Sequence, residues 1–333
     1  MKKLTTLAMV ALITGLMAAG SGLVRASHCT TTVTAPSSIQ TAVDSASSGD
    51  VICLSGTFSS GSTVTIGTSG ITLSEAVGAA AVLDGGSGPA FRLADGLSNV
   101  TIEELEIRNR TGLRGGGIEA WDRTTSNITI RNNYIHDNSY NGVLVGSEGG
   151  FIHTNWMVKK NKVDDHGFAG IELTNCQDCT IMQNTVGPSV LGIIVQARNT
   201  IGGSVHIDAV RVLRNTVDDA VVGVYVIAYE GTTGGSFDSI GASSLLTNVT
   251  INNNTLNRSG FVGVWYRGFN DGGTGRNAKI IHNNITCAAG TGIEVLETGG
   301  PSSGTGTVQN VKVKNNNFSG CSPNLSDPGG VTK

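Results

Sequence analysis

Short apolar segments recur along the chain, each at a fixed position relative to an asparagine. From about residue 99 the sequence repeats an apolar-x-apolar segment, two polar residues, Asn, one further residue and an apolar residue. The copies are VTIEELEI, ITIRNNYI, MVKKNKV, TIMQNTV, VRVLRNTV, VTINNNTL, KIIHNNI and VKVKNNNF. The repeated Asn falls at Asn133, Asn161, Asn184, Asn215, Asn254, Asn283 and Asn316, and Leu105 takes its place in the first copy. Alternation of apolar and polar positions predicts one strand in each copy.

A second strand follows each of the first six asparagines. Eight or nine residues after the Asn comes a Gly, at Gly142, Gly170, Gly192, Gly223, Gly263 and Gly292. These glycines open the segments GVLV, GIEL, GIIV, GVYV, GVWY and GIEV. The constant interval predicts a corner that keeps one shape in every copy. We expect the Asn to adopt the left-handed backbone of that corner and to hydrogen-bond from copy to copy, and the Gly to admit a tight turn.

The spacing of the copies indicates the architecture. Successive repeat asparagines are 23 to 39 residues apart, and the extra residues all follow the second strand. Strands this short cannot bury their apolar residues alone, whereas copies stacked about 4.8 Å apart form parallel sheets around one core. Antiparallel hairpins would not repeat a fixed Asn-to-Gly interval. We therefore predict an all-β chain with a single right-handed parallel β-helix over residues 27–321 and a flexible tail at residues 322–333.

Alternation in the second strand places one side chain of each copy on the outer surface. This row is Glu119, Leu144, Glu172, Ile194, Tyr225, Trp265 and Glu294. Tyr225 and Trp265 would lie one coil apart and offer a flat face for a sugar ring, so we predict that they bind substrate together with Glu119 and Glu172. The two carboxylates would be about 9–10 Å apart by strand spacing, at the outer edge of the range for inverting glycosidases. The alternative is an ordinary solvated sheet surface.

A second polar row follows the asparagines and carries titratable groups. It contains His136, Asp137, Asp164, Asp165, His166, Asp218, Asp219, Asn257 and Arg258, and a basic strip just before the corner contains Arg131, Lys159, Lys160, Arg211 and Arg214. Such groups can neutralise a uronate, take up its proton or bind calcium. If the protein is an enzyme, we predict His136, Asp164, Asp165 and His166 as catalytic residues, with Lys160 or Arg131 neutralising the substrate. The alternative is a polar turn that keeps the surface soluble. Long segments at 110–126, 230–247 and 267–277 would wall the groove.

The N-terminus predicts export. Residues 1–26 have a positive start at Lys2 and Lys3, an apolar stretch from Leu4 to Met17, and Val24-Arg25-Ala26 as a cleavage site, which together are typical of a signal peptide. Its removal would take the formal charge from −3 to −6, because three cations and no acidic residue are lost. We expect a secreted or periplasmic monomer without stable membrane insertion.

Composition limits the partners. Hydrophobic residues make up 39% of the chain and charged residues 14%, so a large core is available and disorder is excluded. Nucleic acid would require a strongly basic surface, so we predict a polysaccharide partner and no nucleic acid. An anionic polysaccharide would have to be met by the basic strip or by a bridging cation.

The six cysteines predict disulfides, as expected in an exported chain. We pair Cys29 with Cys53 and Cys176 with Cys179, although the Cys-x-x-Cys pair could instead hold zinc. Cys287 and Cys321 lie four and five residues after Asn283 and Asn316, which are consecutive repeat asparagines. They therefore occupy nearly the same place on adjacent coils, and we pair them as well.

The segment SIQTAVDSASSGDVICLSGTF, Ser38 to Phe58, resembles the N-terminal segment of pectin-lyase-like β-helix proteins. In that superfamily a short amphipathic helix caps the open end and a Gly-Asp turn leads into the first strand. The residues agree, since Ser37 or Ser38 can cap a helix whose one face carries Ile39 and Val43, and Gly49-Asp50 would end it. The resemblance covers most of residues 37–320.

The resemblance implies several functions, because this fold hosts lyases, hydrolases, epimerases and non-catalytic proteins. The polygalacturonase, mannuronan epimerase and pectate lyase signature motifs are absent from this sequence. The leading hypothesis is a protein that engages a polysaccharide on its lateral face, as a lyase or epimerase of acidic sugars. The rival is a non-catalytic β-helix for adhesion, scaffolding or ligand delivery, as in the periplasmic copper-maturation proteins whose repeats are similar.

Overall fold

The computed structural model describes residues 28–59, 61–112, 114–199, 205–230, 244–269, 274–298, 307–327 and 331–332. The predicted signal peptide, residues 1–26, lies outside these ranges and stays a prediction. Within them, no helix is long and apolar enough to cross a membrane.

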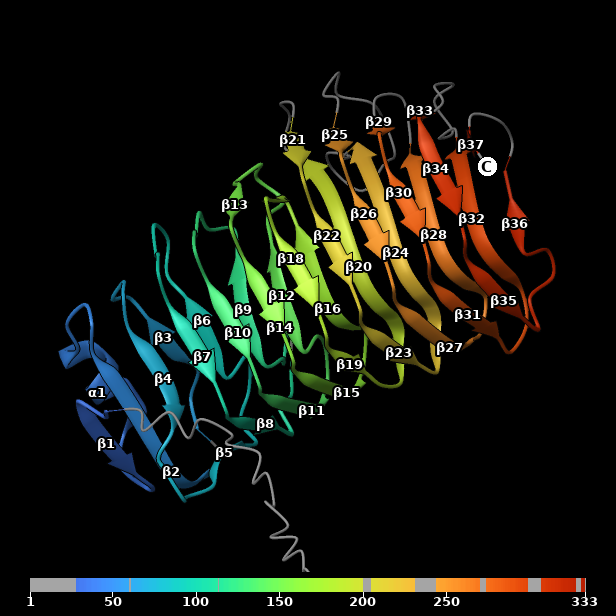
Figure 1. The fold of residues 1–333 in the computed structure, drawn as a ribbon. Coiled ribbons are helices and arrows are strands. Elements are labelled where there is room, and N and C mark those ends of the chain that lie inside the picture. Colours follow the sequence, from blue (N-terminus) through green and yellow to red (C-terminus); the bar gives the residue numbers. More distant parts are fainter. Residues whose placement is uncertain are drawn as a thin grey trace, which may run out of the picture.

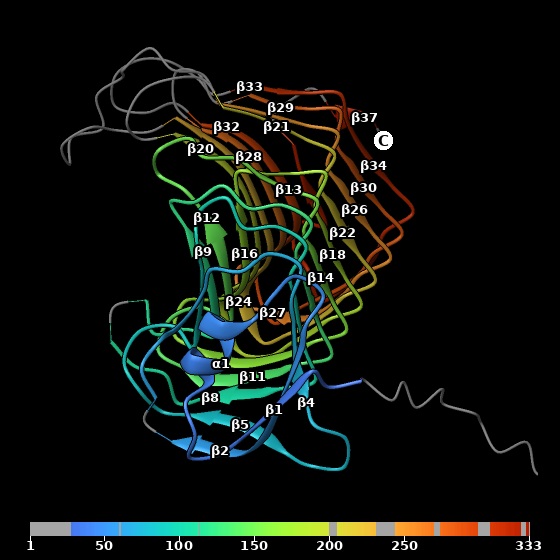
Figure 2. The same ribbon diagram turned by 90° about the vertical axis from the view of Figure 1, so that its left-hand side faces the viewer.

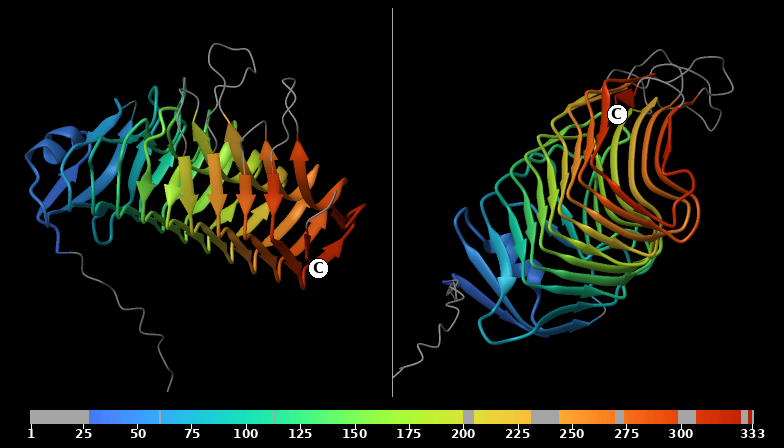
Figure 3. Two further views of the ribbon diagram at one scale, coloured as in Figure 1. Left: turned by 90° about the horizontal axis from the view of Figure 1, so that it is seen from above. Right: turned by 45° about the vertical axis from the view of Figure 1, so that its right-hand side comes forward.

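The chain winds into a stack of coils with three parallel sheets along its sides, here called sheets A, B and C (Figures 1 and 2). Each coil runs from sheet A through sheet B to sheet C, and then returns to sheet A of the next coil. Figure 3 shows the coils following one another in chain order along the stack. All strand pairings join successive coils in parallel, as the repeat predicted.

Sheet A contains β1 (Thr31–Thr34), the first half of β2 (Val51–Ser59), β4 (Thr72–Glu75), β7 (Thr101–Glu103), β10 (Thr129–Arg131), β14 (Met157–Lys159), β18 (Thr180–Met182), β22 (Arg211–Leu213), β26 (Thr250–Asn252), β30 (Lys279–Ile281), β34 (Val311–Lys314) and β37 (Val331–Thr332). Sheet B contains the second half of β2, β5 (Ala81–Asp84), β8 (Glu106–Arg108), β11 (Tyr134–Asn138), β15 (Lys162–His166), β19 (Thr185–Val186), β23 (Thr216–Asp218), β27 (Thr255–Ser259), β31 (Asn284–Cys287) and β35 (Asn317–Ser319). Sheet C contains β3 (Val64–Ile66), β6 (Phe91–Leu93), β9 (Ile118–Trp121), β12 (Val143–Gly146), β16 (Ala169–Thr174), β20 (Ser189–Asn199), β24 (Ala220–Glu230), β28 (Val262–Phe269), β32 (Thr291–Thr298) and β36 (Leu325–Ser326). Two small sheets lie between C and A: β13 (His153–Thr154) with β17 (Cys176–Gln177), and β21 (Val205–Asp208), β25 (Ser244–Thr247), β29 (Thr274–Arg276) and β33 (Thr307–Gln309).

The repeat asparagines form a ladder inside the corner between sheets A and B. Asn184 is typical: its Nδ2 donates to Asn215 Oδ1 at 3.0 Å and to the Val158 carbonyl at 2.9 Å. Its Oδ1 accepts from the backbone N–H and the Nδ2 of Asn161, at 2.9 and 3.0 Å. The same bonds join the ladder from Asn133 to Asn316. The amides of these ladder asparagines therefore have their partners, as buried polar groups require.

The left-handed backbone of this corner belongs to the residue before each ladder position, which corrects the prediction that the repeat Asn adopts it. These residues are Glu104, Asn132, Lys160, Gln183, Arg214, Asn253, His282 and Asn315, with φ between 54° and 61°. The turn is thus made by an outward-pointing polar residue, while the next residue points inward and can join the ladder.

The repeat glycines are required by close approach rather than by a positive φ. A Cβ at Gly142, Gly170, Gly192 or Gly263 would lie 2.4 Å from a methyl group of Val163, Val186, Val217 or Ile285 in sheet B. None of these four glycines has a positive φ. A larger residue would push apart the side chains that fill the corner between sheets B and C.

The interval between Asn and Gly contains a third strand. The constant length of this interval had predicted a corner there instead. The strands of sheet B place a single apolar residue of this interval in the core, for example Ile135 in β11 and Val163 in β15. A segment with only one apolar residue shows no alternation of apolar and polar positions. In the sequence these strands therefore look like polar turns.

Both ends of the stack carry additional structure. Helix α1 (Ile39–Ser45) lies at the N-terminal end, where the Ser38 side chain accepts from the Thr41 backbone N–H and Ile39 and Val43 are buried. That this helix caps the β-helix stays a prediction. Two short strands of the predicted tail, β36 and β37, pair with β32 and β34. The flexibility of residues 322–333 as a whole stays a prediction.

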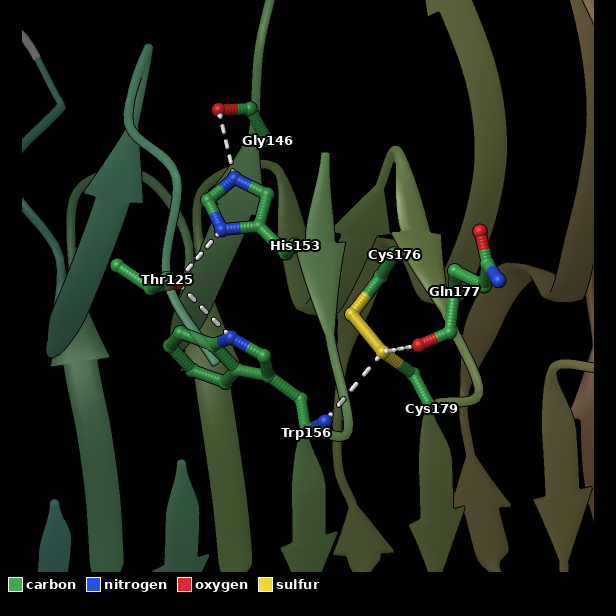
Figure 4. The surroundings of a disulfide bond; sticks show 7 residues. All are labelled: Thr125, Gly146, His153, Trp156, Cys176, Gln177 and Cys179. Carbon is green, nitrogen blue, oxygen red and sulfur yellow. Dashed lines mark hydrogen bonds between the residues drawn. A yellow bond between two sulfur atoms is a disulfide. The ribbon is translucent and has the colours of Figure 1, made fainter. Parts of the chain in front are cut away.

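The three predicted disulfides are present: Cys29–Cys53, Cys176–Cys179 and Cys287–Cys321. Figure 4 shows the surroundings of the second bridge, where the Trp156 backbone N–H approaches Cys179 Sγ at 3.4 Å. The Thr125 hydroxyl accepts from Trp156 Nε1 at 3.0 Å and lies 2.7 Å from His153 Nδ1. His153 Nε2 lies 3.3 Å from the Gly146 carbonyl. These partners fit a neutral imidazole, and burial lowers the pKa of His153 to about 4.

Candidate functional site

The outer row of sheet C follows the predicted order. Strand register joins Glu119, Leu144, Glu172, Ile194, Tyr225, Trp265 and Glu294 in successive coils. The rings of Tyr225 and Trp265 are neighbours, with centroids 5.2 Å apart and planes inclined by 41°. They therefore form an angled aromatic surface rather than the flat face expected.

Further side chains complete this aromatic surface. The Arg267 guanidinium lies 4.3 Å from the centroid of the Trp265 ring, and its Nη1 donates to the Tyr225 hydroxyl at 3.4 Å. Phe261, at 51% exposure, meets Trp265 edge-on with centroids 5.7 Å apart. The cluster therefore joins an aromatic surface to a cation.

Glu119 and Glu172, two of the three glutamates of the row, are covered by neighbouring side chains, so these two positions are not solvated. Glu119 is 4% exposed and pairs with Arg92 Nε at 3.1 Å. Glu172 is 5% exposed, and it accepts from Asn141 Nδ2 at 2.8 Å and from the Thr174 hydroxyl at 3.1 Å. Leu144 separates them in register. Each carboxylate has its own partners, so they do not form an open pair facing one bond.

Burial makes Glu172 chemically unusual. Desolvation raises the pKa of Glu172, opposed by the hydrogen bonds from Asn141 and Thr174 and by the charges of Arg198 and Arg114. A carboxyl group with raised pKa and partial access to a hollow is a feature of functional sites. It binds a proton more readily than an ordinary glutamate.

A hollow of about 180 Å³ lies over Glu172 on the outer face of sheet C. It is lined by Arg114, Trp121, Tyr140, Leu144, Glu148, Phe168, Glu172, Leu191, Ile194, Gln196, Arg198 and Tyr225. The Tyr140 and Phe168 rings stack, with centroids 5.4 Å apart and planes within 12°. Desolvation and the charge of Glu172 raise the pKa of Tyr140, while Arg114 and Arg198 oppose the shift. A phenol, two carboxyls and two guanidiniums thus line one concave site, and Arg198 Nη2 pairs with Glu148 Oε1 at 3.5 Å.

Sequence reasoning missed most residues of this hollow. Tyr140 and Phe168 each lie two residues before a repeat Gly, so the same alignment of copies could have identified their shared position. Arg114 comes from the segment 110–126 that was expected to wall the groove, and Arg198 from the end of β20. The other expected walls include residues 231–243 and 270–273, which lie outside the described ranges.

The predicted catalytic cluster is divided between sheets. His136 and Asp164 are neighbours on the outer face of sheet B, as expected. His136 Nδ1 lies 2.6 Å from Asp137 Oδ2, and its Nε2 lies 3.2 Å from Glu106 Oε1. Asp164 pairs with Lys162 at 3.3 Å. A catalytic role for these two residues stays a prediction. They belong to sheet B, a different side of the stack from sheet C (Figure 2), which carries the hollow.

His166 does not belong to this outer row. Asp165 has φ of 50°, and this left-handed residue breaks the alternation so that the next side chain points inward. His166 is 5% exposed, its Nε2 lies 3.2 Å from the Ile135 carbonyl, and burial lowers its pKa to about 4. Its placement beside His136 on the surface is therefore wrong, because the ring lies in the core.

Arg131 and Lys160 lie on the other side of the Asn corner. Arg131 is on the outer face of sheet A and pairs with Glu103, and Lys160 is the left-handed corner residue of its coil. Neither shares a face with His136, so the grouping of these cations with the histidine is wrong. Among the residues that the structure describes, no three His, Cys, Asp or Glu side chains are grouped to hold a metal ion. Calcium binding stays a prediction.

A family model described as a right-handed beta helix region matches residues 55–233, more than half of the chain. The chain belongs to the right-handed β-helix family. This β-helix protein is 33% identical over 99 residues to mannuronan C5-epimerase AlgE1 of Azotobacter vinelandii, which corresponds to 29% of this chain and 6% of that protein. The chain therefore spans only a small part of that relative.

Solved structures share the fold of this β-helix protein. The A-module of mannuronan C-5 epimerase AlgE6 of Azotobacter vinelandii matches with a TM-score of 0.53 and 14% identity, over 86% of this chain and 83% of that one. The polygalacturonase of Erwinia carotovora ssp. carotovora gives 0.52 and 12%, over 92% and 95% of the two chains. The alginate lyase of Paenibacillus sp. str. FPU-7 gives 0.51 and 15%, over 92% and 100%.

Proposed function

We propose that this protein binds an acidic polysaccharide along the outer face of sheet C and acts on a uronate unit held in the hollow over Glu172. One observation carries the proposal: Tyr140, Glu172, Arg114 and Arg198 line the same concave site. The relatives named as epimerases and as an alginate lyase support it as analogy.

The residues suit chemistry at the carbon next to a carboxylate. Arg114 and Arg198 would bind the uronate carboxylate and stabilise the negative charge that develops when its neighbouring proton leaves. Tyr140 would carry a proton, because a phenol between two cations and a carboxyl can both donate and accept one. Glu172 would donate a hydrogen bond to the substrate carboxylate when it is protonated.

Two reactions share this first step. In β-elimination the base takes the C5 proton, the C4–O bond breaks with a proton passing to the leaving oxygen, and a C4–C5 double bond forms. In epimerisation the proton returns to C5 from the opposite face. The aromatic surface of Tyr225 and Trp265 lies further along the same row and would bind a neighbouring sugar.

The cysteines support a site of action outside the cytoplasm. All six are in disulfides, which persist in oxidising compartments. Together with the predicted signal peptide, they lead us to propose an exported protein.

Incubation with a panel of polyuronates tests the proposal. We expect either new ultraviolet absorbance from elimination or deuterium at C5 in heavy water from epimerisation. Tyr140→Phe should lower the rate at least about 100-fold, the usual size of a proton-transfer contribution. Glu172→Leu, which cannot donate the hydrogen bond to the substrate carboxylate, should also lower it. Glu119→Gln, from the same row, should keep the rate.

Two outcomes contradict this assignment. Loss of turnover in His136→Ala with Tyr140→Phe unaffected would place the chemistry on sheet B. A protein that binds polyuronates but changes none of them would be the non-catalytic β-helix.

A further inference from the structure

The outer face of sheet A carries a set of cations that the hollow does not use. We call it the basic face and define it by Lys159, Lys160, Arg211, Arg214, Lys279, Lys312 and Lys314. Register aligns Arg211, Thr250, Lys279 and Lys312 in one column. All seven side chains are exposed except Lys159, which is half-buried.

These cations lack the partners that other cations of the chain have. Arg108, Lys162 and Arg258, on sheet B, each pair with a carboxylate. Among the described residues, no member of the basic face forms an ion pair within 4.0 Å. The sheet A strands β14, β18, β22, β26, β30 and β34, and the left-handed corner residue that follows each of them, contain no Asp or Glu.

The arrangement is unfavourable for the isolated protein. Lys279 and Lys312 are direct cross-strand partners, and like charges in that position destabilise a sheet. The mature chain is predicted to carry −6 overall, so the basic face does not reflect an excess of basic residues. Charges of one sign collected on one face without a benefit to folding indicate an external anion.

The spacing favours an extended polymer. Strands β14, β22, β30 and β34 carry the charges, and β18 and β26 carry none. Alternate coils place the first charged positions roughly 9–10 Å apart, and the whole face extends about 24 Å by strand spacing. A small anion would contact one or two of these positions, whereas a flexible polyanion can follow them along the stack.

We propose that the basic face is a second binding surface for an acidic polysaccharide, separate from the hollow. The choice of a polysaccharide rests on the proposed function. The exposed side chains of the face are Lys, Arg, His, Gln and Asn, without an aromatic ring on which nucleic-acid bases could stack. The large exposed apolar residues of the described chain, such as Phe151 and Phe261, lie elsewhere. The outward apolar residues of the face, Met182, Leu213 and Ile281, are half-buried between exposed cations, which fits a polar polymer better than membrane insertion.

The location explains what the second surface would do. Sheets A and C are different sides of the stack (Figure 2), so polymer on the basic face leaves the hollow open. A polysaccharide bound to the basic face raises the local concentration of its own remaining segments near sheet C. Long polymers would gain from this effect, and oligomers too short to reach both faces would not.

Matched triple variants test the inference. The first is Lys279→Gln, Lys312→Gln and Lys314→Gln on the basic face, and the control is Arg108→Gln, Lys162→Gln and Arg258→Gln on sheet B. Both lower the net charge by three. We expect the first to bind polygalacturonate or alginate at least tenfold more weakly at low salt, with a shallower salt dependence. The control should bind as the native protein does, and both should process a short oligouronate at the native rate.

Equal polyuronate affinity of the two triple variants would overturn the inference. Tighter binding of anionic phospholipid vesicles or duplex DNA through the same three lysines would overturn the choice of polysaccharide. If polyuronate binding depends on these lysines but no polyuronate is turned over, the second binding surface is supported and the proposed function is contradicted. If polyuronates are turned over but the lysine substitutions leave the affinity unchanged, the proposed function is supported and the second binding surface is contradicted.

Discussion

The inside of the coil and the outer face of sheet C use polar residues in opposite ways. Inside, each ladder asparagine repeats the bonds of the one before it, so a single local arrangement is copied from Asn133 to Asn316. Outside, Glu172 has Asn141 and Thr174, whereas Glu119 has Arg92, so these two glutamates share no partner. The repeated hydrogen bonds stabilise the solenoid. The side chains that differ from coil to coil form the candidate binding site. Substitutions inside should therefore act on stability, and those outside on binding or turnover.

The sharpest test of the interior is acid. Burial lowers the pKa of His153 and of His166 from 6.5 to about 4 in the folded chain, so the unfolded chain binds more protons between these values. The contribution of these two neutral histidines to the free energy of unfolding is fully present above about pH 6.5. It is lost as the pH falls toward 4. Each histidine should account for about 3 kcal/mol of this loss. Denaturant unfolding at a series of pH values measures it.

His166→Asn provides the internal control. It introduces the residue that Asn138 supplies at the matching position of the preceding coil. The variant should lose about half of the pH dependence that the two buried histidines cause. An unchanged profile in His166→Asn would contradict a neutral interior histidine.

Breaking one rung of the ladder should have the next largest effect. Asn184→Ala removes both bonds donated to Val158 and Asn215 and leaves the N–H groups of Asn161 without their acceptor. Because each buried group left unsatisfied costs about 1–3 kcal/mol, we expect a loss of about 4 kcal/mol in the free energy of unfolding. Thr185→Ala, an exposed neighbour, should change it by less than 0.5 kcal/mol. A loss below about 1 kcal/mol in Asn184→Ala would show that the ladder is dispensable.

The outer face should give the smallest effect and a different kind of effect. Trp265→Ala removes a ring that contacts Tyr225, Phe261 and Arg267. We expect about tenfold weaker oligosaccharide binding, or about 1.4 kcal/mol, with little change in the melting temperature. Isothermal titration calorimetry measures the affinity, and Trp265→Phe should restore most of it. A large loss of stability with unchanged affinity would assign Trp265 to the fold.

The sequence predicted what repetition determines. The ladder, the outer row of sheet C and the Cys287–Cys321 disulfide depend on positions that return once per coil, so comparing copies was sufficient. The third sheet was missed because its strands place only one side chain, such as Val163, in the core. His166 was misplaced because the left-handed Asp165 reverses the alternation, and nothing in an Asp-Asp-His sequence indicates where that reversal falls.

The hollow could not be predicted in the same way. Arg114, Tyr140, Glu172 and Arg198 come from three successive turns of the stack and from a loop outside the repeat. Their proximity depends on strand register and on the path of segments that vary from coil to coil. The periodicity of the sequence gives neither the register nor the path of these segments. The proximity of the four residues is therefore visible only in the structure.

The first and last disulfides have a consequence for how the solenoid opens. A coil in the middle is held by neighbours on both sides, whereas a terminal coil has one neighbour and is the natural starting point for unwinding. Cys29–Cys53 ties β1 to the strand beside it, and Cys287–Cys321 ties together two coils at the other end. Under oxidising conditions neither terminal coil can unfold without the strand or coil to which it is linked. Under reducing conditions both terminal coils would fray, and we expect the first proteolytic cleavages there.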